Sequence, residues 1–96
     1  MNCVYKYEFD ERIDRKLIRE QMESATCAAR GVYGKARVKM DGTFLLSNHR
    51  VVIDVSDEVG ALLASVFTEC ANEKIGEEFF VVERVPKHMG REDDES

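Results

Sequence analysis

The sequence lacks a long hydrophobic run. No apolar stretch among its 96 residues approaches the roughly 18 residues that a membrane-spanning helix needs. The N-terminal stretch MNCVYKYEFD also lacks the basic region followed by an apolar stretch that marks a secretory signal. We therefore expect a cytosolic protein that does not associate with membranes.

Cysteine is scarce, and its spacing is uninformative. Cys3, Cys27 and Cys70 are odd in number and lie far apart in the sequence. A disulfide framework favours an even number of cysteines. Zinc sites need short paired spacings of Cys and His, which neither these cysteines nor His49 and His88 show. We expect free thiols, no metal site and no cofactor.

Signatures of catalysis are missing as well. There is no glycine-rich phosphate loop followed by Lys and Ser or Thr. A nucleophilic cysteine needs a neighbouring base or a helix N-terminus, whereas Cys27 and Cys70 fall late in the two helices predicted below. We expect that the protein is not an enzyme.

Positive charge is in deficit. Lys and Arg number 14 against 19 Asp and Glu, which gives a net charge of −5. This balance disfavours a general nucleic-acid binder, because phosphate contacts require a positive field. Residues 87–96 have no apolar side chain after Met89 and end in acidic residues, so we expect a disordered acidic tail after one domain, residues 1–86.

The patterns that are present predict an opening strand and a helix. Residues 3–9 alternate along the chain, as expected for a half-buried strand. Residues 11–29 place apolar side chains at helical spacing opposite a charged face. We place Asp10 at the N-cap of this helix and Gly31 just beyond its C-terminus.

The second half of the domain is predicted to contain another helix and a last strand. A second amphipathic helix is predicted to begin after Ser56 or Asp57 and to end at Gly76. Residues 78–85 form a last strand, which Pro86 stops.

A β-hairpin is predicted between the helices, with its turn at Asp41-Gly42, because this pair readily takes the positive φ angles of a two-residue turn. If the alternation continues to residue 55 without a shift in register, the side chains on the core face are those of Ala36, Val38, Met40, Leu45, Val51, Ile53 and Val55. Polar residues 47–49 interrupt this pattern. Residues 43–55 are therefore either one bulged strand or two strands joined by a second turn, and the second arrangement reverses part of the parity.

The predicted order, strand-helix-strand-strand-helix-strand, resembles that of ferredoxin-like folds. The resemblance lies in the order of elements alone. It implies an α+β sandwich, in which two helices cover one face of an antiparallel sheet and leave the other face bare. We call this bare side the open face.

The predicted parity assigns a set of basic and large apolar side chains to the open face. The alternation of residues 78–85 does not decide between Phe80, Val82 and Arg84 on one side and Phe79, Val81, Glu83 and Val85 on the other; we favour the first set. The candidate binding residues are Lys35, Arg37, Lys39, Phe44, Leu46, Arg50, Val52, Phe80, Val82 and Arg84.

We expect a binding partner to bury this surface, because monomers rarely expose contiguous apolar patches that have no function. The binding partner is a second copy of the chain, a different protein, or single-stranded nucleic acid whose bases stack on the aromatic side chains. We expect a non-enzymatic protein-binding module, an adaptor, regulator or inhibitor, that is homodimeric through the open face. The alternative is a domain that binds single-stranded RNA or DNA.

Overall fold

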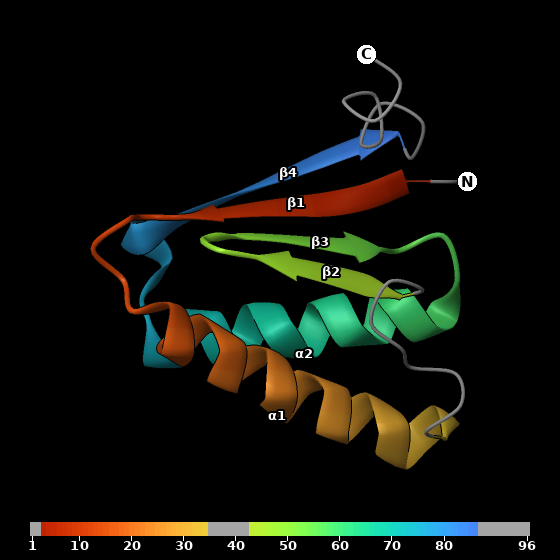
Figure 1. Ribbon diagram of the computed structural model, residues 1–96. Helices are drawn as coiled ribbons and strands as arrows, with labels where there is room; N and C mark the ends of the chain where they lie inside the picture. The colour runs from red at the N-terminus through yellow and green to blue at the C-terminus, as the bar shows by residue number, and fades with distance from the viewer. Residues whose placement is uncertain (1–2, 35–42, 87–96) are drawn as a thin grey trace.

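The computed structural model describes residues 3–34 and 43–86, which form a sheet and two helices (Figure 1). The elements along the chain are β1 (Cys3–Phe9), α1 (Arg15–Tyr33), β2 (Phe44–Ser47), β3 (Arg50–Asp54), α2 (Glu58–Lys74), the 3₁₀ turn η2 (Glu77–Phe79) and β4 (Phe80–Pro86). The predicted tail, residues 87–96, and the predicted turn at Asp41-Gly42 lie outside the described residues.

The sheet has the order β2-β3-β1-β4, and each neighbouring pair of strands is antiparallel. Both helices lie on the same side of it (Figure 1). The prediction of an α+β protein with an antiparallel sheet and two helices is therefore confirmed. In this order β2 and β4 are the two edges of the described sheet.

Helix α1 begins and ends later than predicted. The carboxylate of Asp14 accepts a hydrogen bond from the backbone N–H of Lys16 (2.8 Å), so Asp14 is the N-cap and the assignment of Asp10 was wrong. Asp10 instead binds the Arg12 guanidinium (Oδ2 to Nη2, 2.7 Å), which lowers the pKa of Asp10 to about 2. At the other end the helix continues through Gly31 and stops at Gly34, whose φ of 93° suits glycine.

Helix α2 begins where the sequence predicts. Asp57 is the N-cap, and its side chain accepts a hydrogen bond from the backbone N–H of Gly60 (3.1 Å). Gly60 also lies tightly against the end of β3, because a Cβ atom added there would meet the carbonyl oxygen of Asp54. The absence of a side chain at Gly60 thus lets α2 pack directly on the strand that precedes it.

The core lies between the sheet and the helices, and Tyr7 is at its centre. Its ring is fully buried and meets that of Phe67 edge to face, with ring centroids 5.0 Å apart. Its hydroxyl shares a 2.7 Å hydrogen bond with Thr68 Oγ1. Burial raises the pKa of the Tyr7 hydroxyl, and the bond to Thr68 partly offsets this effect. Tyr7 therefore ties the central strand to α2 by both packing and hydrogen bonding.

Candidate functional site

The hairpin between the helices turns at Asn48-His49. Ser47 pairs with Arg50 across this two-residue turn, and Asn48 takes a φ of 52° that Asn tolerates better than most residues. Residues 43–55 thus contain two strands joined by a second turn, which is one of the two arrangements left open by the sequence.

This turn reverses the predicted orientation of β2. Residues directly opposite in an antiparallel pair share a face. Phe44 faces Ile53 and Leu46 faces Val51, two fully buried core residues. Both side chains are half-buried against the helices, so their predicted placement on the open face was wrong. Leu45, expected in the core, is 47% exposed.

The preferred orientation of β4 was wrong too. Phe80 pairs with Phe9 and stacks on its ring, with centroids 4.9 Å apart. Val82 faces Tyr7, which is buried under the helices. Because side chains alternate along a strand, Arg84 lies on the helix side together with Phe80 and Val82. The other set, with Val81, Glu83 and Val85, lies on the open face.

The prediction for β3 is confirmed. Val51 and Ile53 are core residues, which leaves Arg50 and Val52 on the open face. There the Arg50 guanidinium forms an ion pair with Glu8 across the sheet (Nη2 to Oε2, 3.3 Å). The remaining candidates, Lys35, Arg37 and Lys39, lie outside the described residues.

The open face carries aliphatic side chains and charges of both signs. Strand register arranges it in three cross-strand rows: Ser47-Arg50-Glu8-Val81, Leu45-Val52-Lys6-Glu83 and Asp54-Val4-Val85. It contains no aromatic side chain among the described residues. Its most exposed aliphatic side chain is Val81, at 71%.

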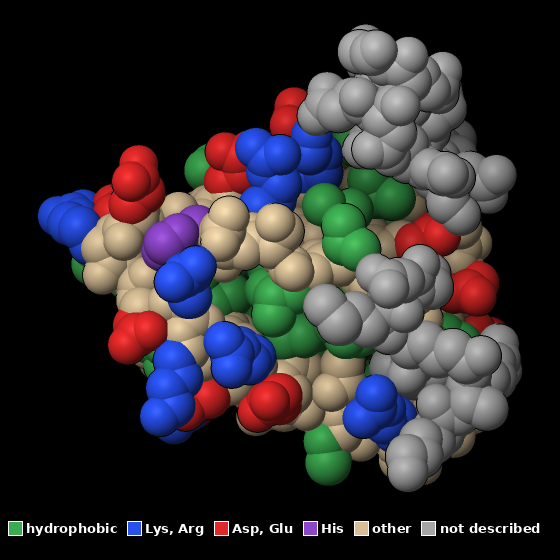
Figure 2. Space-filling view, viewed as in Figure 1, with side chains coloured by type: hydrophobic (Ala, Val, Ile, Leu, Met, Phe, Trp, Pro, Cys, Tyr) green, Lys and Arg blue, Asp and Glu red, His purple; other side chains and the backbone are tan. Residues whose placement is uncertain are grey.

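A groove of about 700 Å³ between α1 and the edge strand β2 is the second surface of note. Met22, Phe44 and Leu46 line it with apolar atoms, and Lys16 and Arg19 of α1 are on its rim. Figure 2 shows this side of the molecule, where hydrophobic side chains are visible beside Lys and Arg side chains. Sequence reasoning missed this groove, because no local pattern indicates that α1 lies beside β2.

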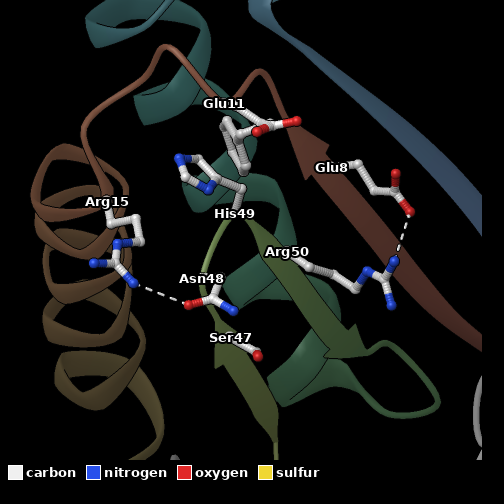
Figure 3. A pocket seen from close by; sticks show the side chains of 8 residues that line it. Glu8, Glu11, Arg15, Ser47, Asn48, His49 and Arg50 are labelled. Atoms are coloured by element: carbon white, nitrogen blue, oxygen red, sulfur yellow. Dashed lines mark hydrogen bonds and ion pairs between the residues drawn. The ribbon is translucent and has the colours of Figure 1, made fainter.

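A pocket at the tip of the hairpin holds several polar side chains (Figure 3). Arg15 donates a hydrogen bond to Asn48 Oδ1 (3.0 Å), and His49 Nε2 donates to the carbonyl of Ile13 (2.8 Å). These contacts join the hairpin to the start of α1. Because Arg15, Asn48 and His49 bind neighbouring protein groups, we interpret them as holding the hairpin in place.

Three further findings bear on function. Within residues 3–34 and 43–86, no group of three His, Cys, Asp or Glu side chains is placed to hold a metal ion. No helix of the described chain has the length and apolar character to cross a membrane. No protein-family model, curated protein or solved structure matches the sequence or the fold. The described chain is thus a small α+β protein with a sheet face opposite its helices, on which Val81 and Leu45 are exposed and Val4 is buried.

Proposed function

We propose that this protein is a non-enzymatic, cytosolic protein-binding module with a ferredoxin-like fold, and that it forms a homodimer through its open face. The sheet order β2-β3-β1-β4 and the position of both helices on one side support the fold assignment. An adaptor, regulator or inhibitor would use such a module to hold another protein.

The observation that carries the homodimer is the mixed charge of the open face. Lys6 and Arg50 stand among Glu8, Asp54 and Glu83, with aliphatic side chains between them. In a two-fold dimer each patch meets a copy of itself, so a surface dominated by one sign of charge would repel its own copy. A nearly balanced face has no such penalty, and its exposed aliphatic side chains, Val81 and Leu45, gain by burial.

The size of the face points to a weak dimer. The described residues of the open face are fewer than the roughly 20–30 residues per side of a standard interface. We therefore expect a dissociation constant of about 1–10 μM, at the weak end for specific interfaces. A dimer of this strength would respond to changes in protein concentration.

The nucleic-acid alternative loses its main support. Stacking of single-stranded bases requires exposed aromatic rings beside basic side chains. Phe44 and Phe80, the two rings expected to serve this role, are half-buried on the helix side. The described charges of the open face are also more often acidic than basic.

Two adjacent valines of β4 provide a matched test of the dimer. Val81 lies on the open face and Val82 on the helix side, and both are exposed. We expect Val81→Lys to weaken self-association at least tenfold, because the interface would bury an ammonium group. In the monomer this lysine lies opposite Glu8, so the fold should tolerate it.

Val82→Lys is the control and should leave self-association within about twofold of the wild type, as expected for a residue outside the interface. Sedimentation velocity over a range of protein concentrations measures both variants. A wild-type protein that stays monomeric at about 100 μM, well above the expected dissociation constant, would refute the homodimer. So would equal effects of the two substitutions.

A further inference from the structure

Strand β2 is an edge that lacks the usual protection against pairing. Its sequence, Phe44-Leu45-Leu46-Ser47, contains no charge and no proline. The other edge strand, β4, contains Glu83, Arg84 and Pro86, the residue types that discourage a further strand. Of the two edges of the described sheet, β2 is thus the one suited to accept a strand.

The pairing register shows which backbone groups of β2 point outward. Hydrogen-bonded and non-hydrogen-bonded pairs alternate along an antiparallel ladder. The N–H of Asp54 donates to the carbonyl of Thr43 (2.9 Å), so Thr43, Leu45 and Ser47 direct their backbone groups toward β3. The N–H and C=O groups of Phe44 and Leu46 are therefore directed to the outer edge.

The groove described above lies on the helix side of this same edge. Its apolar part consists of Met22 on α1 and the side chains of Phe44 and Leu46. A strand added to β2 would point every second side chain toward α1. Aliphatic side chains at such positions would contact the apolar part of the groove.

The charge of the groove indicates the chemistry of its occupant. Arg15, Lys16 and Arg19 line it, against Asp14 and Glu23, on a chain whose net charge is −5. The carboxylate of Asp14 is already engaged in capping α1. Neither Lys16 nor Arg19 forms an ion pair within the part of the chain that is described. The groove is thus more basic than the protein as a whole, and complementary to an acidic segment.

We propose that β2 and the groove bind an extended acidic segment of a partner protein, which joins the sheet as an additional strand. The partner's backbone pairs with Phe44 and Leu46, and its helix-side positions alternate between aliphatic and acidic side chains. The acidic side chains reach Lys16 and Arg19. This site is on a different surface from the open face, so it does not depend on dimerisation.

A synthetic peptide tests the proposal directly. The probe is a fluorescein-labelled peptide of two Thr-Val-Thr-Glu repeats, and its partner control carries Lys in place of Glu. Fluorescence anisotropy should show binding of the acidic peptide and at least tenfold weaker binding of the basic one, since the latter meets like charges on the rim. Absence of binding by the acidic peptide, or equal binding of both, would overturn the proposal.

Two matched charge reversals locate the site. Lys16→Glu should weaken peptide binding by about five- to tenfold, because an attraction is replaced by a repulsion. An acidic residue in the first turn of a helix also suits its dipole, so α1 should remain folded. Lys74→Glu makes the same change at the end of α2, outside the lining of the groove, and should alter the affinity by less than about twofold. Equal effects of the two reversals would place binding elsewhere.

Amide hydrogen exchange tests the added strand. In the free protein the amides of Phe44 and Leu46 should exchange quickly, while those of Leu45 and Ser47 are protected by β3. The acidic peptide should slow exchange at Phe44 and Leu46. Protection of these two amides before peptide is added would show an occupied edge and refute the proposal.

Two further measurements separate this proposal from others. The first measurement uses an oligoadenylate as a competing polyanion. If it binds as tightly as the peptide and its binding depends equally on Lys16, the groove is a general polyanion surface and the proposed peptide site is refuted. The Val81→Lys variant should bind the peptide as the wild type does. If Val81→Lys no longer dimerises but still binds the peptide, neither proposed surface is refuted. If it also loses peptide binding, the two surfaces are not independent.

Discussion

Gly60 illustrates how one residue decides the packing of a whole helix. A Cβ atom at this position would overlap the carbonyl oxygen of Asp54, and because this is a backbone atom, no side-chain rotation can relieve the clash. Gly60→Ala must therefore push α2 away from β3. We expect a loss of unfolding free energy of about 3 kcal/mol, in the range of severe overpacking.

Gly31→Ala is the matched control for Gly60→Ala. Gly31 lies in α1, and a Cβ there would have no heavy atom within 4 Å beyond its own surroundings. Alanine favours the helix over glycine, so this variant should gain about 0.5–1 kcal/mol. Urea denaturation measures both variants. Similar changes in the two would show that the contact between Gly60 and Asp54 does not constrain α2.

At the scale of an element, the β2-β3 hairpin makes the sharpest prediction. Phe44→Glu places a carboxylate against the core and should lower the unfolding free energy by about 3 kcal/mol or more. Leu45→Glu changes an exposed side chain on the other face of the same strand and should cost under about 1 kcal/mol. Thermal melts of the two neighbours compare them directly. The reverse order of stability would mean that the register at Asn48-His49 is displaced by one residue.

At the scale of the whole molecule, the two proposed surfaces lie on opposite sides of the sheet. The open face is opposite the helices (Figure 1), while the groove is on the helix side beside β2. A dimer formed through the open face would therefore leave the groove accessible. If both proposals hold, we expect the protein to bind its own copy and an acidic partner at the same time.

Dimerisation should also appear in the stability of the whole molecule. Because dimerisation stabilises the folded state by mass action, the thermal midpoint should rise with protein concentration. From tenfold below to tenfold above the dissociation constant we expect a rise of roughly 5 °C, which corresponds to about 1 kcal/mol in a domain of this size. Val81→Lys should flatten this dependence. Calorimetry at several concentrations measures it, and a constant midpoint in the wild type would contradict the dimer.

Features that rest on local patterns could be predicted from the amino-acid sequence. Strand β1 matches its predicted limits, because alternation over residues 3–9 reports a half-buried strand directly. Helix α2 begins directly after its N-cap, Asp57, as predicted, because a capping carboxylate interacts only with the first turn of its own helix. Even so, the N-cap of α1 was predicted at Asp10, whereas Asp14 caps the helix and Asp10 forms an ion pair with Arg12.

The faces that β2 and β4 turn toward the core depend on tertiary contacts. Side chains alternate in any strand, so the sequence of β2 allows Phe44 or Leu45 to face the core with equal ease. The turn at Asn48-His49 and pairing with Val51 and Ile53 select Phe44, as stacking on Phe9 selects Phe80 in β4. The groove has the same origin, because it joins residues of α1 to a strand that follows much later in the chain. Contacts between distant segments thus determine the surfaces, whereas local spacing determines the elements.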